Sequence, residues 1–179
     1  MFVVQGSSRA NGNTELLTKV MLEGMEVETV QLRDKKIFPI FDKRHDEEGF
    51  PQVDDDFAAI VERMLLHDQI VLTTPLYWYG MSGHLKNFVD RWSQALRVPE
   101  LDFKERMKGK QVYVVIVGGR DARVKALPLV QQFQLICNFL ELSFVGYVIG
   151  EAAKPGDIMH DHHALDAAAV WNRRLKENG

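Results

Sequence analysis

Residues 1–25, MFVVQGSSRANGNTELLTKVMLEGM, are the first indication of how this chain folds. The apolar run MFVVQ is followed by GSSRANGNT, a loop of small and polar residues, and then by a stretch in which apolar residues such as Leu17 and Met21 recur at helical spacing. The pattern predicts a strand, a loop and a helix in succession. A loop in this position can direct backbone N–H groups and the positive end of the helix dipole at an anion.

The same alternation continues along the rest of the chain. The strand candidates are short, mostly continuous apolar runs, which is typical of parallel strands covered on both faces; they are residues 1–5, 27–32, 69–74, 111–117 and 142–150. Apolar stripes at helical spacing separate or follow them, at 57–65, 85–96, 129–140 and 165–175. This order predicts an α/β protein with a flavodoxin-like three-layer α/β/α sandwich and a five-stranded parallel sheet in the order 2-1-3-4-5.

Length, composition and charge narrow the class of partner. The 179 residues, 46% of them apolar, predict a single domain over residues 1–179. Lys plus Arg (22) nearly balance Asp plus Glu (25), so a net charge of −3 gives no electrostatic reason to expect nucleic acid or an anionic membrane. A strand candidate begins at the first residue and no apolar run is long enough to span a bilayer, so we expect a cytoplasmic protein.

The single cysteine excludes a disulfide within the chain and a metal site built from several thiolates. Cys137 shares a helical stripe with Val130 and Phe133, so we expect it to be buried in the core. The tract HDHH at 160–163 has the composition of a metal site, but a loop and cap before the last helix is the favoured interpretation. We assign no metal.

Ligands of open α/β sheets bind beyond the carboxyl ends of the strands, beside strand one. Three loops are therefore expected to meet at a binding site: GSSRANGNT at 6–14, PLYWYGMSG at 75–83 and GGRDAR at 118–123. Their sequences are the least explained by packing alone.

The first loop lacks both the lysine of a nucleoside-triphosphate loop and the glycine spacing of a dinucleotide fingerprint, which leaves a single terminal phosphate as its ligand. Hydroxyls, an amide and one guanidinium are available to hold it; the candidates are Ser7, Ser8, Arg9, Asn13 and Thr14. An alternative remains open in which Asn11 or Asn13 only caps the first helix and Gly12 makes the turn.

The second loop carries three adjacent aromatic residues where an ordinary loop would be polar. Leu76, Tyr77 and Trp78 offer apolar surface to a flat ring, although a core or interface cluster is the alternative. In the third loop, Gly118 and Gly119 permit close backbone approach to a ligand, or make a plain turn. Together the three loops describe a mononucleotide with a large planar ring, namely FMN.

Three segments, GSSRANGNTELL, TTPLYWYGMSGHLKNFVDRW and VVIVGGR, resemble the NAD(P)H-dependent FMN reductase family of flavodoxin-like proteins, especially the branch that includes the iron–sulfur flavoproteins. The resemblance implies FMN as cofactor, NADPH or NADH as co-substrate, a small electron acceptor such as a quinone, nitro or azo compound or free flavin, and a homodimer or homotetramer. It also implies that the phosphate is held by Ser7, Arg9, Asn13 and Thr14, that Pro75, Leu76, Tyr77 and Trp78 line the isoalloxazine, and that Gly118, Gly119 and Arg120 border its pyrimidine edge. No catalytic side chain is required.

One departure from the resemblance excludes an iron–sulfur cluster, because residues 33–53 contain no cysteine where the iron–sulfur flavoproteins carry theirs. This long irregular segment is expected to act as a lid or an interface arm. Two other classes of function stay open. One is a non-enzymatic FMN electron carrier of flavodoxin type, and the other is a flavin-free regulatory module on the same fold.

Overall fold

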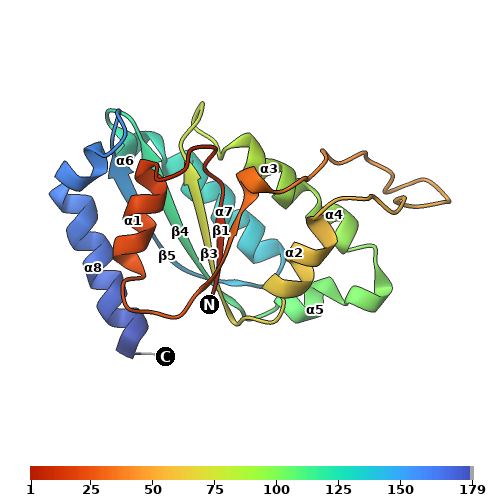
Figure 1. Cartoon of the computed structure of the whole chain (residues 1–179). Coiled ribbons are helices and arrows are strands. Elements are labelled where there is room, and N and C mark those ends of the chain that lie inside the picture. The colour runs from red at the N-terminus through yellow and green to blue at the C-terminus, as the bar shows by residue number, and fades with distance from the viewer. Residues whose placement is uncertain (178–179) are drawn as a thin grey trace.

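A five-stranded parallel sheet forms the centre of the computed structural model, which describes residues 1–177 (Figure 1). Its strand order, β2-β1-β3-β4-β5, confirms the predicted order, and every strand ends within two residues of its predicted bounds. The strands are β1 (Phe2–Gln5), β2 (Glu28–Gln31), β3 (Gln69–Pro75), β4 (Gln111–Gly118) and β5 (Ser143–Glu151).

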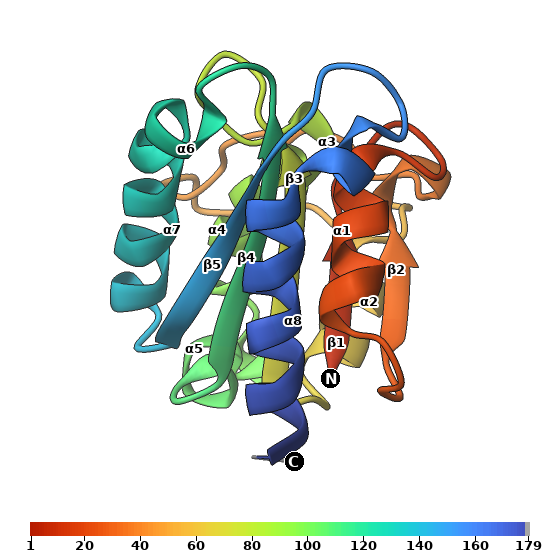
Figure 2. The same cartoon turned by 90° about the vertical axis from the view of Figure 1, so that its left-hand side faces the viewer.

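Helices cover both faces of the sheet and complete the predicted three layers. Figure 2 shows two of them in front of the sheet, α1 (Asn13–Met21) and α8 (His162–Glu177). The opposite face carries α2 (Phe57–Met64), α3 (Gly83–Asp90), α4 (Trp92–Ala95), α5 (Phe103–Met107) and α7 (Leu127–Phe139), with the short α6 (Ala122–Lys125) leading into α7. Three 3₁₀ turns complete the connections: η1 (Leu32–Asp34), η2 (Pro99–Leu101) and η3 (Asp157–His160).

Alternate residues of each strand enter one of two apolar cores, which explains why the strand sequences are continuously apolar. Val3, Val71 and Val115 pack against α1 and α8. Val4 and Leu72 pack in the opposite core. Cys137 is also buried there, as predicted, and burial raises the pKa of its thiol to about 12. None of the helices in residues 1–177 has the length and apolar character that a membrane span requires.

The apolar stripe at 85–96 is predicted as one helix but forms two, α3 and α4, which meet at Arg91. The carbonyl of Arg91 accepts hydrogen bonds from the N–H groups of both Gln94 and Ala95, so a tighter turn interrupts the regular ladder. The Arg91 side chain is buried and its guanidinium lies 2.7 Å from the carboxylate of Asp55. The amphipathic pattern therefore predicted where the helical segment lies, but not that it divides into two helices.

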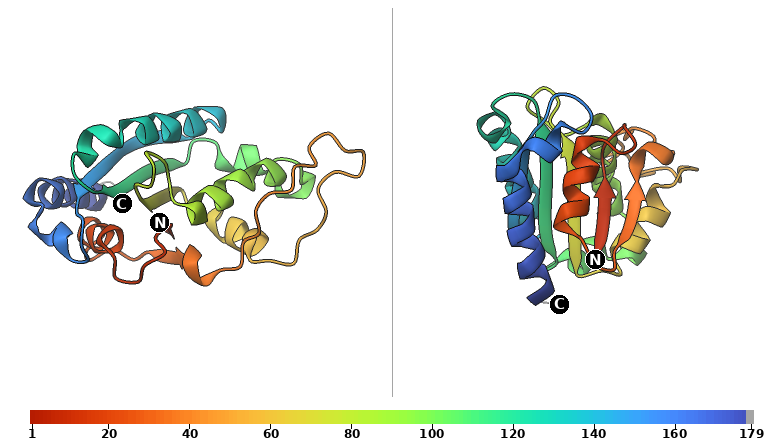
Figure 3. Two further views of the ribbon diagram at one scale, coloured as in Figure 1. Left: turned by 90° about the horizontal axis from the view of Figure 1, so that it is seen from above. Right: turned by 60° about the vertical axis from the view of Figure 1, so that its left-hand side comes forward.

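Residues 35–56 form an irregular arm that projects away from the sheet, as both Figure 1 and the view from above in Figure 3 show. The ends of the arm are joined, because the N–H of Lys36 donates to the Asp56 carboxylate at 2.7 Å and the Asp56 N–H donates to the Lys36 carbonyl at 2.9 Å. The Asp55 carboxylate accepts the N–H of Phe38 at 3.0 Å in the same region. The irregular segment predicted at 33–53 thus has an ordered neck.

Candidate functional site

The loops that follow β1, β3 and β4 meet at the upper edge of the sheet in Figure 2 and enclose a cavity of about 230 Å³. All of the predicted site residues line it except Ser8, Trp78 and Arg120, which lie outside. The lining residues are Ser7, Arg9, Gly12, Asn13, Thr14, Pro75, Leu76, Tyr77, Val117, Gly118, Gly119, Ala152 and Ala153.

The first loop delivers polar groups to this cavity without capping the helix that follows it. Gly12 is the N-cap of α1 and no side chain accepts a hydrogen bond there, so the alternative in which Asn11 or Asn13 serves as a side-chain cap does not hold. Thr14 is buried, and its hydroxyl makes no hydrogen bond to the described residues. The Ser7 hydroxyl instead turns the loop by bonding the N–H and carbonyl of Arg9, each at 3.2 Å.

The Asn13 side chain, which is predicted to contact the phosphate, forms hydrogen bonds to the loop after β5. Its amide donates to the Lys154 carbonyl at 2.8 Å, and its oxygen accepts the N–H groups of Gly156 at 2.9 Å and Ile158 at 3.4 Å. These bonds hold the loop after β5 against the start of α1 and bring Ala152 into the cavity wall. The backbone N–H of Asn13 lies in the first turn of α1, where the N–H groups have no partner within the helix.

The buried carboxylate of Glu15 holds the first loop in place. Glu15 accepts the N–H of Asn11 at 3.0 Å and pairs with Lys19 at 3.2 Å and Arg33 at 3.4 Å. Burial by itself would raise the pKa of the Glu15 carboxyl. The hydrogen bonds from Lys19 and Asn11, together with both positive charges, outweigh burial and hold that pKa below its usual range.

Ser82 ties the second loop to the first, a role that sequence reasoning missed. Its hydroxyl donates to the Gly6 carbonyl at 2.5 Å and accepts the N–H of Leu85 at 3.2 Å, which caps α3. The contact is close: a Cβ at Gly6 would lie 2.7 Å from the carbonyl oxygen of Thr73. The only local signal was a serine three residues before an apolar helical stripe.

Trp78 and Tyr79 form the tip of an unusual tight turn. Tyr77 and Gly80 exchange backbone hydrogen bonds at 3.0 and 2.9 Å, and the two residues between them have φ of +48° and +63°. Such turns favour Asn and Gly because both central residues are left-handed, and bulky residues there cost on the order of 1–3 kcal/mol each. Trp78 is nonetheless 96% exposed and Tyr79 57% exposed.

The third loop joins the ends of three strands beside the cavity. The Val117 carbonyl accepts the N–H of Leu76, and the Gly118 carbonyl accepts the N–H of Ala152, both at 2.8 Å. A Cβ at Gly118 would lie 3.1 Å from Leu76, whereas Gly119 faces open space. Gly118 therefore lies where the chain packs closely against Leu76, whereas the backbone of Gly119 is accessible.

Two charged residues of the third loop, Arg120 and Arg123, do not line the cavity. Arg120 is almost fully exposed and lies 3.9 Å from the carboxylate of Asp121. Arg123 pairs with Glu151 at 3.0 Å and with Asp161. Asp161 also accepts the N–H of Ala164 at 3.2 Å at the start of α8, which confirms a capping role for the HDHH tract.

Comparisons with known proteins identify a matching family and several relatives of this chain. A family model described as NADPH-dependent FMN reductase matches residues 1–153. The chain is 48% identical over 173 residues to YwqN of Bacillus subtilis (strain 168), which is named as an NAD(P)H-dependent FMN-containing oxidoreductase, with 96% of each chain covered. It is 29% identical over 187 residues to an iron–sulfur flavoprotein of Methanocaldococcus jannaschii, covering 97% of this chain and 94% of the other.

Among solved structures, the chain is similar to one described as a Trp repressor binding protein from Bacillus subtilis. The TM-score is 0.81, the sequence identity is 42%, and the match covers 95% of this chain and 96% of the other. The match extends to α8 and therefore beyond the residues that the family model covers.

Proposed function

The chain belongs to the NADPH-dependent FMN reductase family, and we propose that the cavity at the carboxyl edge of its sheet holds FMN while NADPH or NADH supplies electrons for a small acceptor. The observation that carries this proposal is the meeting of three loops, distant in sequence, around one cavity. FMN, when bound, would supply the two-electron redox chemistry that links the nicotinamide to the acceptor. The side chains bind and orient the reactants.

The phosphate of FMN fits the part of the cavity made by the first loop. Arg9 supplies a guanidinium, the unpaired Thr14 hydroxyl supplies a donor, and the first turn of α1 supplies backbone N–H groups. Ser7 shapes the loop through its bonds to Arg9, and Asn13 contributes through its backbone while its side chain holds the neighbouring loop. Ser8 is exposed and is not needed.

The flavin ring fits against the second and third loops. Pro75, Leu76 and Tyr77 give it an apolar wall, and the backbone at Gly118 and Gly119 gives its polar edge hydrogen-bonding groups. Because Gly119 has no neighbour within 4 Å of a Cβ position, the ring can approach its backbone closely. No side chain is required as an acid or base in this arrangement.

Trp78 and Tyr79 are proposed to receive the electron acceptor, which favours flat aromatic acceptors such as quinones and nitro or azo compounds. The support is that both residues are exposed, have a left-handed backbone conformation, and directly follow Tyr77, which lines the cavity. Strain of this kind persists at sites where function requires it.

Trp78→Asn is expected to raise the free energy of unfolding by about 1 kcal/mol, because Asn tolerates the left-handed conformation. The same substitution is expected to lower kcat/KM for a naphthoquinone about tenfold, since one stacking surface is lost. Urea unfolding and steady-state kinetics measure the two effects. Reduction of ferricyanide, which needs no stacking surface, is the control and should not change. A stability gain without a loss of quinone reduction would contradict the acceptor assignment.

We further propose that the protein is a homodimer or homotetramer that uses the groove between α3, α4 and α7. Trp92 lines this groove, and its indole Nε1 is the buried side-chain polar atom that lacks a hydrogen-bond partner among the described residues. Leu135 and Phe139, on the same groove, are more than 60% exposed. A second copy would cover this apolar surface.

Phe139→Asp is expected to shift the protein from oligomer to monomer, because it places a charge in the proposed interface. Sedimentation velocity at several concentrations measures the change. Val27→Asp, at an exposed apolar position beside the sheet edge strand, is the matched control. Equal sedimentation of both variants and the parent protein would argue against this interface.

The first experiment on function is an absorbance spectrum of purified protein after FMN is added and the free cofactor is removed by gel filtration. We expect retained yellow colour that bleaches when NADPH or NADH is added without oxygen. Colour that neither nucleotide bleaches would indicate an electron carrier instead. Absence of retained flavin would favour a flavin-free module, a role in keeping with the name of the structural relative described as a Trp repressor binding protein.

A further inference from the structure

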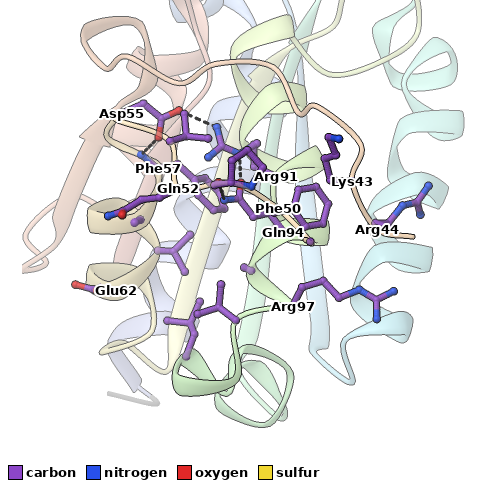
Figure 4. A pocket seen from close by; sticks show the side chains of 18 of the residues that line it. Lys43, Arg44, Phe50, Gln52, Asp55, Phe57, Glu62, Arg91, Gln94 and Arg97 are labelled. Atoms are coloured by element: carbon purple, nitrogen blue, oxygen red, sulfur yellow. Dashed lines mark hydrogen bonds and ion pairs between the residues drawn. The ribbon is translucent and has the colours of Figure 1, made fainter. Parts of the chain in front are cut away.

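A second cavity, of about 470 Å³, lies between the arm and helices α2 and α4 and shares no residue with the proposed FMN cavity (Figure 4). Its volume is within the range of sites that bind small organic molecules. Phe57, Val61 and Ala95 contribute a buried apolar floor. Phe50 and Val98 extend this apolar surface towards solvent.

The arm is anchored beside this cavity by a buried ion pair. Arg91 and Asp55 lie 2.7 Å apart, and both side chains are at most 3% exposed. The Arg91 guanidinium also lies over the ring of Phe57, 4.6 Å from its centroid, and donates to the Gln94 side chain at 2.6 Å. Gln94 in turn donates to the Pro51 carbonyl at 3.4 Å. The wall made by the arm is therefore tied to α4.

Charge is distributed unequally around the cavity. In Figure 4, Lys43, Arg44 and Arg97 lie on one side and Glu62 lies on the other; Glu48 of the arm also lines the cavity. Lys43 and Arg44 pair with acidic residues of the arm itself. The Arg97 guanidinium forms no ion pair or side-chain hydrogen bond with residues 1–177. One cation at the cavity edge thus remains available to an anion.

We propose that this cavity binds a small organic anion, with an aromatic or aliphatic body against the floor at Phe57 and Val61 and a carboxylate near Arg97. The apolar floor selects the body of the ligand, and the cationic side selects its charge. Such a ligand would bind independently of FMN. Its binding would also hold the arm against α2 and α4, because the arm forms part of the cavity wall.

Isothermal titration calorimetry of the FMN-loaded protein tests this proposal, with 1-naphthoate as the aromatic probe, decanoate as the aliphatic probe and decyltrimethylammonium as the cationic counterpart. We expect one site per chain for at least one carboxylate, with binding of the cation at least tenfold weaker. No binding of either carboxylate, equal binding of the cation, or displacement of FMN would overturn the proposal.

Three variants locate the bound anion. Arg97→Glu is expected to weaken carboxylate binding about fivefold, whereas Arg173→Glu, which makes the same charge change on α8, should leave it unchanged. Leu135→Glu, in the groove beside α7, should also leave it unchanged. A loss with Leu135→Glu instead of Arg97→Glu would place the probe in that groove and overturn the proposal. Affinity that falls as protein concentration rises would also overturn it, because a second copy would then occupy the cavity.

Discussion

Replacement of Arg9 and Thr14 together by alanine is expected to weaken FMN binding roughly a hundredfold while the fold stays intact. A hydrogen bond to a charged group contributes about 1.5–3 kcal/mol and a further one about 1 kcal/mol, and each 1.4 kcal/mol is a factor of ten in Kd. Arg9 is exposed, and the Thr14 hydroxyl makes no hydrogen bond to the described residues, so neither polar group supports the fold. Titration of the FMN-free protein, followed by flavin fluorescence, measures the loss.

The matched control for this variant is Ser8→Ala combined with Arg120→Ala. It removes one hydroxyl and one guanidinium from the same edge of the sheet, but at positions outside the cavity. We expect its FMN affinity to stay within twofold of the parent. If the control lost as much affinity as the Arg9 and Thr14 variant, the effect would reflect the overall charge of this edge. If neither variant lost affinity, the phosphate would bind elsewhere.

The fold could be predicted from sequence because its signals are local and repeated. Runs such as residues 69–74 and 111–117 are too continuous for half-exposed strands, and helical stripes stand between them. Alternation of this kind with short connections leaves few topologies open. Strand order in turn indicates the edge at which loops converge, so three loops that lie far apart in the sequence could be expected to share one site.

The parts of the site that sequence reasoning missed depend on contacts between distant residues. Asn13 looks like a phosphate ligand or a helix cap from its neighbours, but its partners are Lys154, Gly156 and Ile158. Ser82 looks like an ordinary N-cap, although its hydroxyl also holds Gly6. Neither contact leaves a trace in local periodicity, because both are set by how two loops approach across the sheet edge.

Trp78 illustrates a different limit of sequence reasoning. An aromatic residue at the end of a buried strand was expected to line the ring, and the structure instead places it outside the cavity. The two left-handed residues of its turn determine this orientation, and aromatic residues give no local signal for such a turn. The sequence predicted that this loop borders the cavity, which Tyr77 does, but not the direction in which Trp78 projects.

Arg91→Met is expected to lower the free energy of unfolding at neutral pH by about 3–5 kcal/mol, because it leaves the buried Asp55 carboxylate without its partner. In the parent protein, burial alone would raise the pKa of Asp55. Hydrogen bonds from Arg91 and from the N–H groups of Phe38 and Phe57 outweigh burial and hold the pKa below its ordinary value of 3.8. Urea unfolding at a series of pH values measures both effects.

The sign of the pH dependence separates loss of this ion pair from a general packing defect. A lowered folded-state pKa means that the Asp55 contribution in the parent protein is fully present above pH 3.8 and is lost as the pH falls towards the lower folded value. Without Arg91, burial dominates and raises the pKa, so the penalty in Arg91→Met should shrink as the pH falls. Arg91→Met combined with Asp55→Asn should recover part of the stability at neutral pH. A penalty that stays constant with pH and persists in the double variant would show that packing of the Arg91 side chain, and not its charge, holds the arm.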